Sequence, residues 1–187
     1  PARGRPPRCC LALLSGCVGK GKGLKNRAAY FGVFTALALI FSYIETLIPV
    51  NFGIQGAKLG LANLVIVIVL YKTDFKEALL LSVTRVALAG FIFGNLFGIL
   101  YGLAGAVLSL VAMECLKLRS SFSVVGVSIA GGVSHNIGQL IVAMIVVETY
   151  QVGYYLPVLL VAGVVTGTLI GIVCREVLRH INNVTFV

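Results

Sequence analysis

The chain has 187 residues, of which 59% are hydrophobic and 11% are charged, and its mean hydropathy is +1.04. Soluble domains average about 45–50% apolar and about 25% charged residues, so this composition excludes an ordinary soluble domain and indicates an integral membrane protein. Its formal net charge is +9. Apolar runs of membrane-spanning length, without the alternation of barrel strands, predict an all-α membrane bundle.

The first 24 residues, PARGRPPRCCLALLSGCVGKGKGL, differ in composition from the rest of the chain. They are basic and rich in proline, glycine and cysteine, so we expect a disordered tail at 1–24 and a transmembrane domain at 25–187. The string LSGC, which ends at Cys17, resembles a lipoprotein cleavage site. The apolar segment before it is only about six residues long, too short for a signal peptide.

Six transmembrane helices are expected in the remaining chain. The first helix ends at Pro49. The second helix ends at the charged turn YKTDFK and is short for a segment that crosses the whole membrane. From 78 to 113 the only charge is Arg85, and a single helix there would measure roughly 54 Å against a hydrocarbon core of roughly 30 Å, so the segment must fold back near 93–98. The predicted helices are about 28–48, 58–71, 77–94, 97–116, 123–147 and 155–175.

The positive charges predict the orientation of this bundle. Cytoplasmic loops of membrane proteins carry an excess of lysine and arginine. Such residues precede the first helix, follow the last, and occupy the second and fourth loops, whereas the other three loops carry only Lys58. We therefore expect both termini in the cytoplasm, and the basic balance needs no nucleic-acid partner.

The residue inventory argues against catalysis. Asp74 is the only aspartate among six acidic residues, so a paired-aspartate magnesium site cannot be built. Ser134 and His135 are adjacent, and adjacent helical side chains point about 100° apart, which suits a nucleophile and its base poorly. The cysteines show no metal-ligand spacing. We predict a protein that is not an enzyme, with no metal site and no cofactor.

Polar side chains at membrane depth are the candidate site. Inserting an ionised group at that depth costs roughly 2.5 to 3.5 kcal/mol on insertion scales, so each such residue is expected to have a functional or structural role that offsets the cost. His135 and Gln139 share one helix face at i and i+4. With the topology above, the set falls at the midplane or in the outer half of the membrane and comes from several helices. The candidate substrate-binding residues are Glu45, Lys58, Asn63, Arg85, Asn95, His135, Asn136 and Gln139.

Two interpretations of this set stay open. In the first, the residues line a polar cavity that opens outward, and an excess of possible cations over the single Glu45 favours a negatively charged ligand. In the second, Arg85 and Glu45 neutralise each other while the polar residues of the fifth helix hydrogen-bond between helices and hold the bundle together.

Three stripes of small residues recur every four positions. Such stripes let a second helix approach closely. Internal packing is expected to explain two of the three, whereas the stripe on the first helix lies in its cytoplasmic half, where a membrane partner can dock. The stripes are Ala28, Gly32 and Ala36; Gly98, Gly102 and Ala106; and Gly163, Gly167 and Gly171.

The strings SYIETLIPV, GAKLGLANLVIVIVLY, FKEALLLSVTRV, GVSHNIGQLIVA and YYLPVLLVAGVVTGTLIG, in this order, resemble the bacterial membrane family called heptaprenyl diphosphate synthase component I or Gx transporter. The resemblance covers about residues 26–180. That family is similar in turn to the substrate-binding S components of energy-coupling factor (ECF) transporters. The resemblance implies a multi-pass protein of the bacterial cytoplasmic membrane that captures a vitamin or another micronutrient from outside.

The same resemblance implies partners. S components dock through an alanine-rich face of the first helix against a membrane T component that two ATPase subunits drive. Ala28, Gly32 and Ala36 occupy the equivalent place here, with one glycine substituted. The outer loop at 49–58 would act as the gate. The alternative function is a non-catalytic membrane subunit of a redox or quinone- or isoprenoid-related complex, which small-residue stripes fit equally well.

Overall fold

The computed structural model describes residues 9–47, 60–93, 96–119, 122–148 and 150–180. Within these ranges the chain forms six α-helices and one 3-10 helix and contains no strand, which confirms the predicted all-α, six-helix architecture. The elements are α1 (Cys9–Leu47), α2 (Leu61–Lys72), α3 (Phe75–Phe93), α4 (Leu96–Leu118), α5 (Val124–Val147), η1 (Tyr150–Tyr155) and α6 (Leu156–His180).

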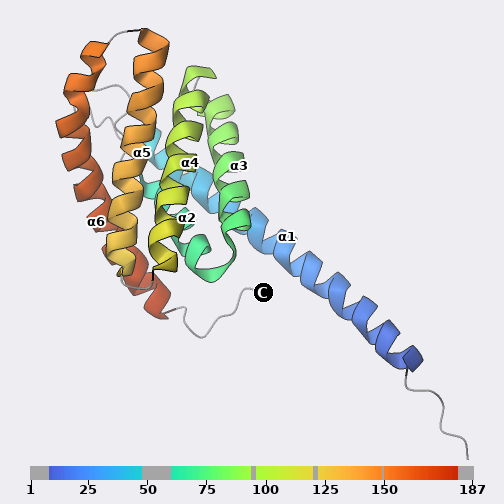
Figure 1. The fold of residues 1–187 in the computed structure, drawn as a ribbon. Coiled ribbons are helices and arrows are strands. Elements are labelled where there is room, and N and C mark those ends of the chain that lie inside the picture. Colours follow the sequence, from blue (N-terminus) through green and yellow to red (C-terminus); the bar gives the residue numbers. More distant parts are fainter. Residues whose placement is uncertain (1–8, 48–59, 94–95, 120–121, 149, 181–187) are drawn as a thin grey trace, which may run out of the picture.

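The helix α1 differs from its prediction at its amino-terminal end. It begins at Cys9, so residues 9–24 are helical where a disordered tail was expected. The last proline before Pro49 is Pro7, and the glycines between them each cost a helix about 1 kcal/mol without breaking it as proline does. The 39 residues of α1 make a rod of roughly 58 Å. Figure 1 shows its amino-terminal part extending away from the bundle.

The other helices pack in a simple order. The helices α3, α4, α5 and α6 each contact the next one along the chain, and Figure 1 shows them side by side. The helix α2 contacts α1, α3 and α6 and is apolar all round, with seven of its 12 residues buried. Its side chains therefore form the centre of the core, whose buried members include Val65, Ile66 and Leu70.

Among the described residues, four helical segments are long and apolar enough to cross a membrane, and their bounds are Ala28–Leu47, Leu96–Leu118, Val124–Val147 and Gln151–His180. The helix α3 has 19 residues but carries Lys76, Glu77 and Arg85, and α2 has 12. At about 1.5 Å per residue α2 is only about 18 Å long, which is too short to cross a hydrocarbon core of roughly 30 Å. The chain is a multi-pass membrane protein.

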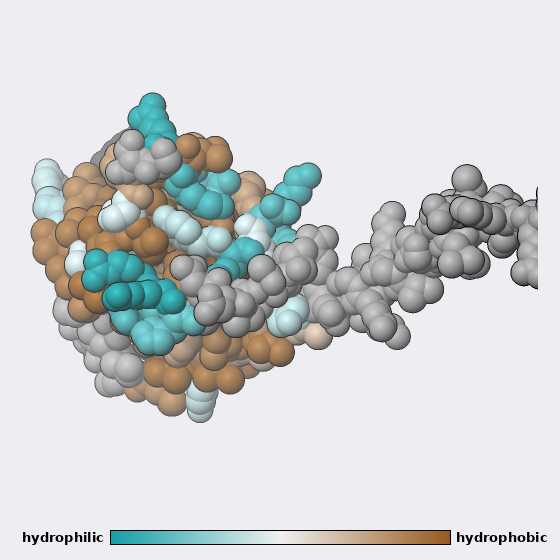
Figure 2. Space-filling model, turned by 90° about the horizontal axis from the view of Figure 1, so that it is seen from below, coloured by the Kyte–Doolittle hydropathy of each residue, from teal (hydrophilic) through white to brown (hydrophobic). Residues whose placement is uncertain are grey.

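Charged residues gather at one end of the bundle. The α2–α3 turn, the α4–α5 turn and the carboxyl end of α6 all lie there (Figure 1). Figure 2 views this end and shows hydrophilic residues among apolar ones. The cations of this basic end are Lys72, Lys76, Lys117, Arg119, Arg175 and Arg179. Its assignment to the cytoplasm stays a prediction from the distribution of positive charges.

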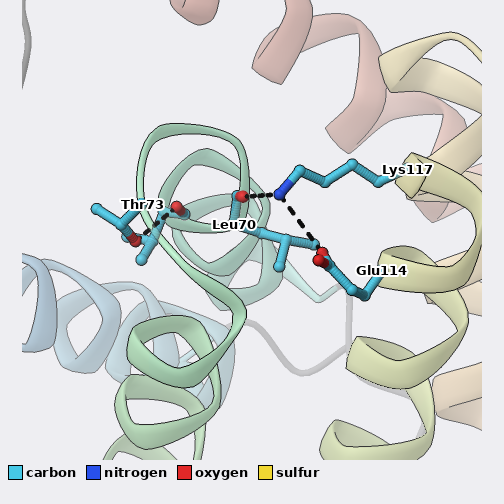
Figure 3. A network of polar contacts seen from close by, with 5 residues as sticks. Leu70, Thr73, Glu114 and Lys117 are labelled. Atoms are coloured by element: carbon cyan, nitrogen blue, oxygen red, sulfur yellow. Dashed lines mark hydrogen bonds and ion pairs between the residues drawn. The ribbon is translucent and has the colours of Figure 1, made fainter. Parts of the chain in front are cut away.

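The carboxyl end of α2 is capped by a side chain from another helix. Lys117 on α4 donates a hydrogen bond from Nζ to the Leu70 carbonyl oxygen at 2.8 Å and lies 3.4 Å from Glu114 Oε2 (Figure 3). The Thr73 hydroxyl donates to the Val69 oxygen at 2.9 Å. The last carbonyls of a helix have no intrahelical partner, and an ammonium group there also complements the helix dipole.

Replacing Lys117 by methionine is expected to lower the free energy of unfolding by about 1 kcal/mol, because a charged hydrogen bond is lost from a side chain that is 26% exposed. The unfolding midpoint in detergent should fall by roughly 2–4 °C. Lys76→Met removes an exposed cation from the same end and should leave the midpoint unchanged. An equal fall of the unfolding midpoint in both variants would mean that Lys117 stabilises the fold through its positive charge alone and not through its hydrogen bond to Leu70.

The interface between α5 and α6 depends on glycine. A Cβ atom at Gly167 would lie 2.7 Å from Ile129 Cα and 2.9 Å from the Ser128 oxygen, and one at Gly163 would lie 3.0 Å from Val133 Cα. The stripe on α4 is also internal, since a Cβ at Gly102 would lie 2.8 Å from Val86 Cγ1. Two of the three predicted stripes therefore serve packing within the bundle.

Candidate functional site

A cavity of about 100 Å³ lies between α1, α2, α3, α4 and α5, toward the end of the bundle opposite the basic end. Five of the eight sequence-predicted residues line it, and they come from four helices. These five are Glu45, Asn63, Arg85, His135 and Gln139. Residues up to 94 positions apart thus meet at one place, although binding of a ligand there stays a prediction.

Glu45 lies where α1 meets the start of α2. Its carboxylate Oε1 accepts a hydrogen bond from the Leu61 backbone N–H. The N-cap residue of α2 is Gly60, in the left-handed conformation with φ of 73°, and it has no side chain to cap the helix. Glu45 supplies that cap from another helix, and a carboxylate at a helix amino terminus is also favoured by the dipole.

Arg85 is the central cation of the cavity. Its side chain is 7% exposed, and Nη2 donates to Asn63 Oδ1 at the long distance of 3.5 Å. Within the part of the chain that the structure describes, the buried Arg85 Nε has no hydrogen-bond partner. A buried donor left unpaired costs about 1–3 kcal/mol, and binding of an anion by this guanidinium group stays a prediction.

His135 and Gln139 form the α5 wall of the cavity, as their i and i+4 spacing predicted. They lie against Gly105 of α4. A Cβ atom at Gly105 would be 3.0 Å from both His135 Cε1 and Gln139 Cγ, and 2.9 Å from the His135 backbone oxygen. The glycine therefore lets α4 and α5 approach closely where these two side chains line the cavity.

Asn136 has a different place. It lines a second chamber of about 20 Å³ rather than the main cavity, and its Nδ2 donates to the Leu159 carbonyl oxygen at 2.8 Å. That bond links α5 to α6. For this residue the packing interpretation describes the observed contact, because the amide holds two helices together. The chamber volume suits a single water molecule.

Lys58 and Asn95 lie outside the described residues, as does the predicted gate at 49–58. Sequence reasoning missed several other residues of the cavity wall, among them Ser42, Thr46 and Gly60. Ser42 lies three residues before Glu45 and four before Thr46, so it shares a helix face with each of them, and that spacing was the available signal. Among the described residues, no three His, Cys, Asp or Glu side chains cluster as metal ligands would.

The small-residue stripe on α1 is unlike the other two. Ala28, Gly32 and Ala36 are all exposed, and a Cβ atom at Gly32 would meet no atom of the described residues within 4 Å. The neighbouring apolar side chains of this helix are also exposed, with Val33 at 65%. This face therefore packs against neither of the helices that α1 contacts, α2 and α3.

The family model described as heptaprenyl diphosphate synthase component I matches residues 34–177, well over half of the 187 residues. The matched region runs from α1 to α6 and contains every described residue of the cavity wall. Comparisons with curated proteins and with solved structures give no significant match.

Proposed function

Because the chain belongs to the heptaprenyl diphosphate synthase component I family, we propose that it is the membrane-embedded substrate-binding component of an ECF-type importer. In this role it captures a small polar or anionic micronutrient from the outer side. The observation that carries the proposal is the meeting of Glu45, Asn63, Arg85, His135 and Gln139 in one cavity, away from the basic end.

The family description favours a protein that works with partners, since it names component I of a synthase. A catalytic role for this chain conflicts with its residues, because the single Asp74 cannot form the paired-aspartate magnesium site of diphosphate chemistry. The proposal assigns nucleotide hydrolysis to two ATPase subunits and places the protein in the bacterial cytoplasmic membrane with both termini inside.

Docking of the membrane T component is assigned to the exposed face of Ala28, Gly32 and Ala36. A face of small residues permits close helix contact, and this is the one of the three stripes that the bundle leaves uncovered. Docking there leaves the cavity walls on α2 to α5 free to hold a ligand.

Gly32→Leu is expected to reduce co-purification of the T component at least tenfold, because the new side chain keeps the two helices apart. The thermal unfolding midpoint of the isolated protein should not change, since no described atom would contact the added Cβ. Val33→Leu, one position along the same exposed helix, is the matched control and should retain the partner. If Gly32→Leu and the native chain co-purify equal amounts of the T component, this face of α1 is not the docking site.

The test of the whole function is native mass spectrometry of the tagged protein, purified from its native membranes in mild detergent. A defined small-molecule adduct together with T and ATPase subunits is the expected result. Recovery with other membrane subunits and no adduct would favour the alternative, a non-catalytic subunit of a redox or quinone- or isoprenoid-related complex. The Asn136 bond between α5 and α6 fits that alternative, because it shows that one candidate residue serves packing.

A further inference from the structure

The amino terminus of α2 opens into the cavity. Gly60 and Asn63 both line it, and the Asn63 N–H donates to the Gly60 oxygen at 2.8 Å in the first turn. Helix amino termini favour anions, because their first N–H groups have no partner within the helix and the dipole places partial positive charge there. In α2 an internal anion, the Glu45 carboxylate, already accepts from the Leu61 N–H.

Arg85 gives a second and independent indication of an anion. More than nine-tenths of its surface is buried, it lines the same cavity, and its Nε has no partner among the described residues. A guanidinium group binds a carboxylate or a phosphate through two parallel N–H donors. The cavity therefore offers two kinds of anion-binding donor, one from α3 and one from α2.

The charges of these groups set up a competition. Arg85 is the described cation of the cavity wall and Glu45 is its described anion. A ligand anion that entered would place a second negative charge near Glu45 in a region of low dielectric, where like charges repel strongly. Binding is favoured when Glu45 yields its position at the start of α2.

We propose that the ligand is a small anion, a carboxylate or a phosphate, and that Glu45 is a built-in competitor for the anion site formed by Arg85 and the amino terminus of α2. This inference rests on the proposed capture function and specifies its ligand. The described part of the cavity has a volume of about 100 Å³, which makes small anions suitable first probes.

Glu45→Gln tests the competition, because it keeps the size of the side chain and removes its charge. The probes are acetate, lactate and inorganic phosphate, each titrated against chloride at constant ionic strength into the full chain in lipid-free, non-ionic detergent. The dissociation constant follows from the rise in unfolding midpoint with anion concentration. We expect at least one probe to bind the native chain and to bind Glu45→Gln about tenfold more tightly.

Glu114→Gln is the matched control, because it removes one negative charge beside Lys117 at the basic end, away from the cavity. Its anion affinity should equal that of the native chain. If Glu45→Gln does not fold, Glu45→Asp retains the charge on a shorter side chain, loosens its hold on Leu61, and should raise the affinity about threefold.

The outcomes separate the two proposals. Anion binding that Glu45 variants weaken or leave unchanged would overturn the competitor role and leave capture intact. Absence of binding by all three probes in every variant would overturn the anion site, whereas capture of an uncharged polar ligand would still be tested by native mass spectrometry. An equal gain in Glu114→Gln would assign the effect to overall charge and overturn the inference.

Discussion

Replacing Gly167 by alanine should lower the unfolding midpoint of the protein by several degrees, although alanine is the better helix former. The added Cβ would lie 2.7 Å from Ile129 Cα and 2.9 Å from the Ser128 oxygen, both main-chain atoms that cannot rotate away. The helices α5 and α6 must separate, and overpacking of this kind typically costs about 1–3 kcal/mol. For a chain of this size, that corresponds to roughly 2–12 °C.

Gly32→Ala is the control for this prediction, because it makes the same change in another helix. A Cβ at Gly32 meets nothing within 4 Å, so only the helix propensity changes and the midpoint should stay the same or rise. Both variants are compared by thermal unfolding in one detergent. A midpoint for Gly167→Ala at or above that of Gly32→Ala would show that the close contact of α5 and α6 does not limit stability.

This pair of glycines marks what the sequence can and cannot predict. Gly32 and Gly167 belong to stripes with the same spacing, so periodicity alone gives them the same expected role. Gly167 is buried between helices, whereas Gly32 is exposed. The difference arises from which helices are neighbours, a property of the tertiary arrangement that no local pattern contains.

Helix number was accessible from the sequence because membrane thickness limits helix length. The 36 residues from 78 to 113, which carry Arg85 as their only charge, had to fold back, and α3 and α4 do end and begin near the expected turn, at Phe93 and Leu96. The start of α1 was not accessible in this way, because glycine weakens a helix without ending it. Composition therefore suggested disorder where the structure has helix from Cys9.

The sequence predicted which residues line the candidate site but did not predict which contacts each of them makes. The cost of polar groups in a membrane singled out Glu45, Arg85, His135 and Gln139, and all four line one cavity. That Glu45 caps α2 depends on α2 beginning inside the bundle beside α1, which its sequence does not show. Asn136 satisfied the same sequence criterion and instead bonds to α6.

Arg85→Gln should abolish measurable anion binding, with a loss of at least about 100-fold in affinity. Each hydrogen bond to a charged group contributes about 1.5–3 kcal/mol to the binding free energy, and an anion bound by two such bonds loses both in this variant. A tenfold change in the dissociation constant corresponds to about 1.4 kcal/mol. The same titration of acetate, lactate and phosphate measures the effect. The fold should persist, because Arg85 makes only one long hydrogen bond, to Asn63, within the described chain.

Two further variants identify the cause of that loss. Arg85→Lys keeps the charge and removes the planar fork, so it should lose about tenfold and bind more tightly than Arg85→Gln. Arg175→Gln removes one exposed cation at the basic end and should bind as the native chain does. If Arg85→Gln binds the probes unchanged, the anion is held elsewhere. If Arg175→Gln and Arg85→Gln lose affinity equally, net charge attracts the anion and the buried guanidinium has no specific part in holding it.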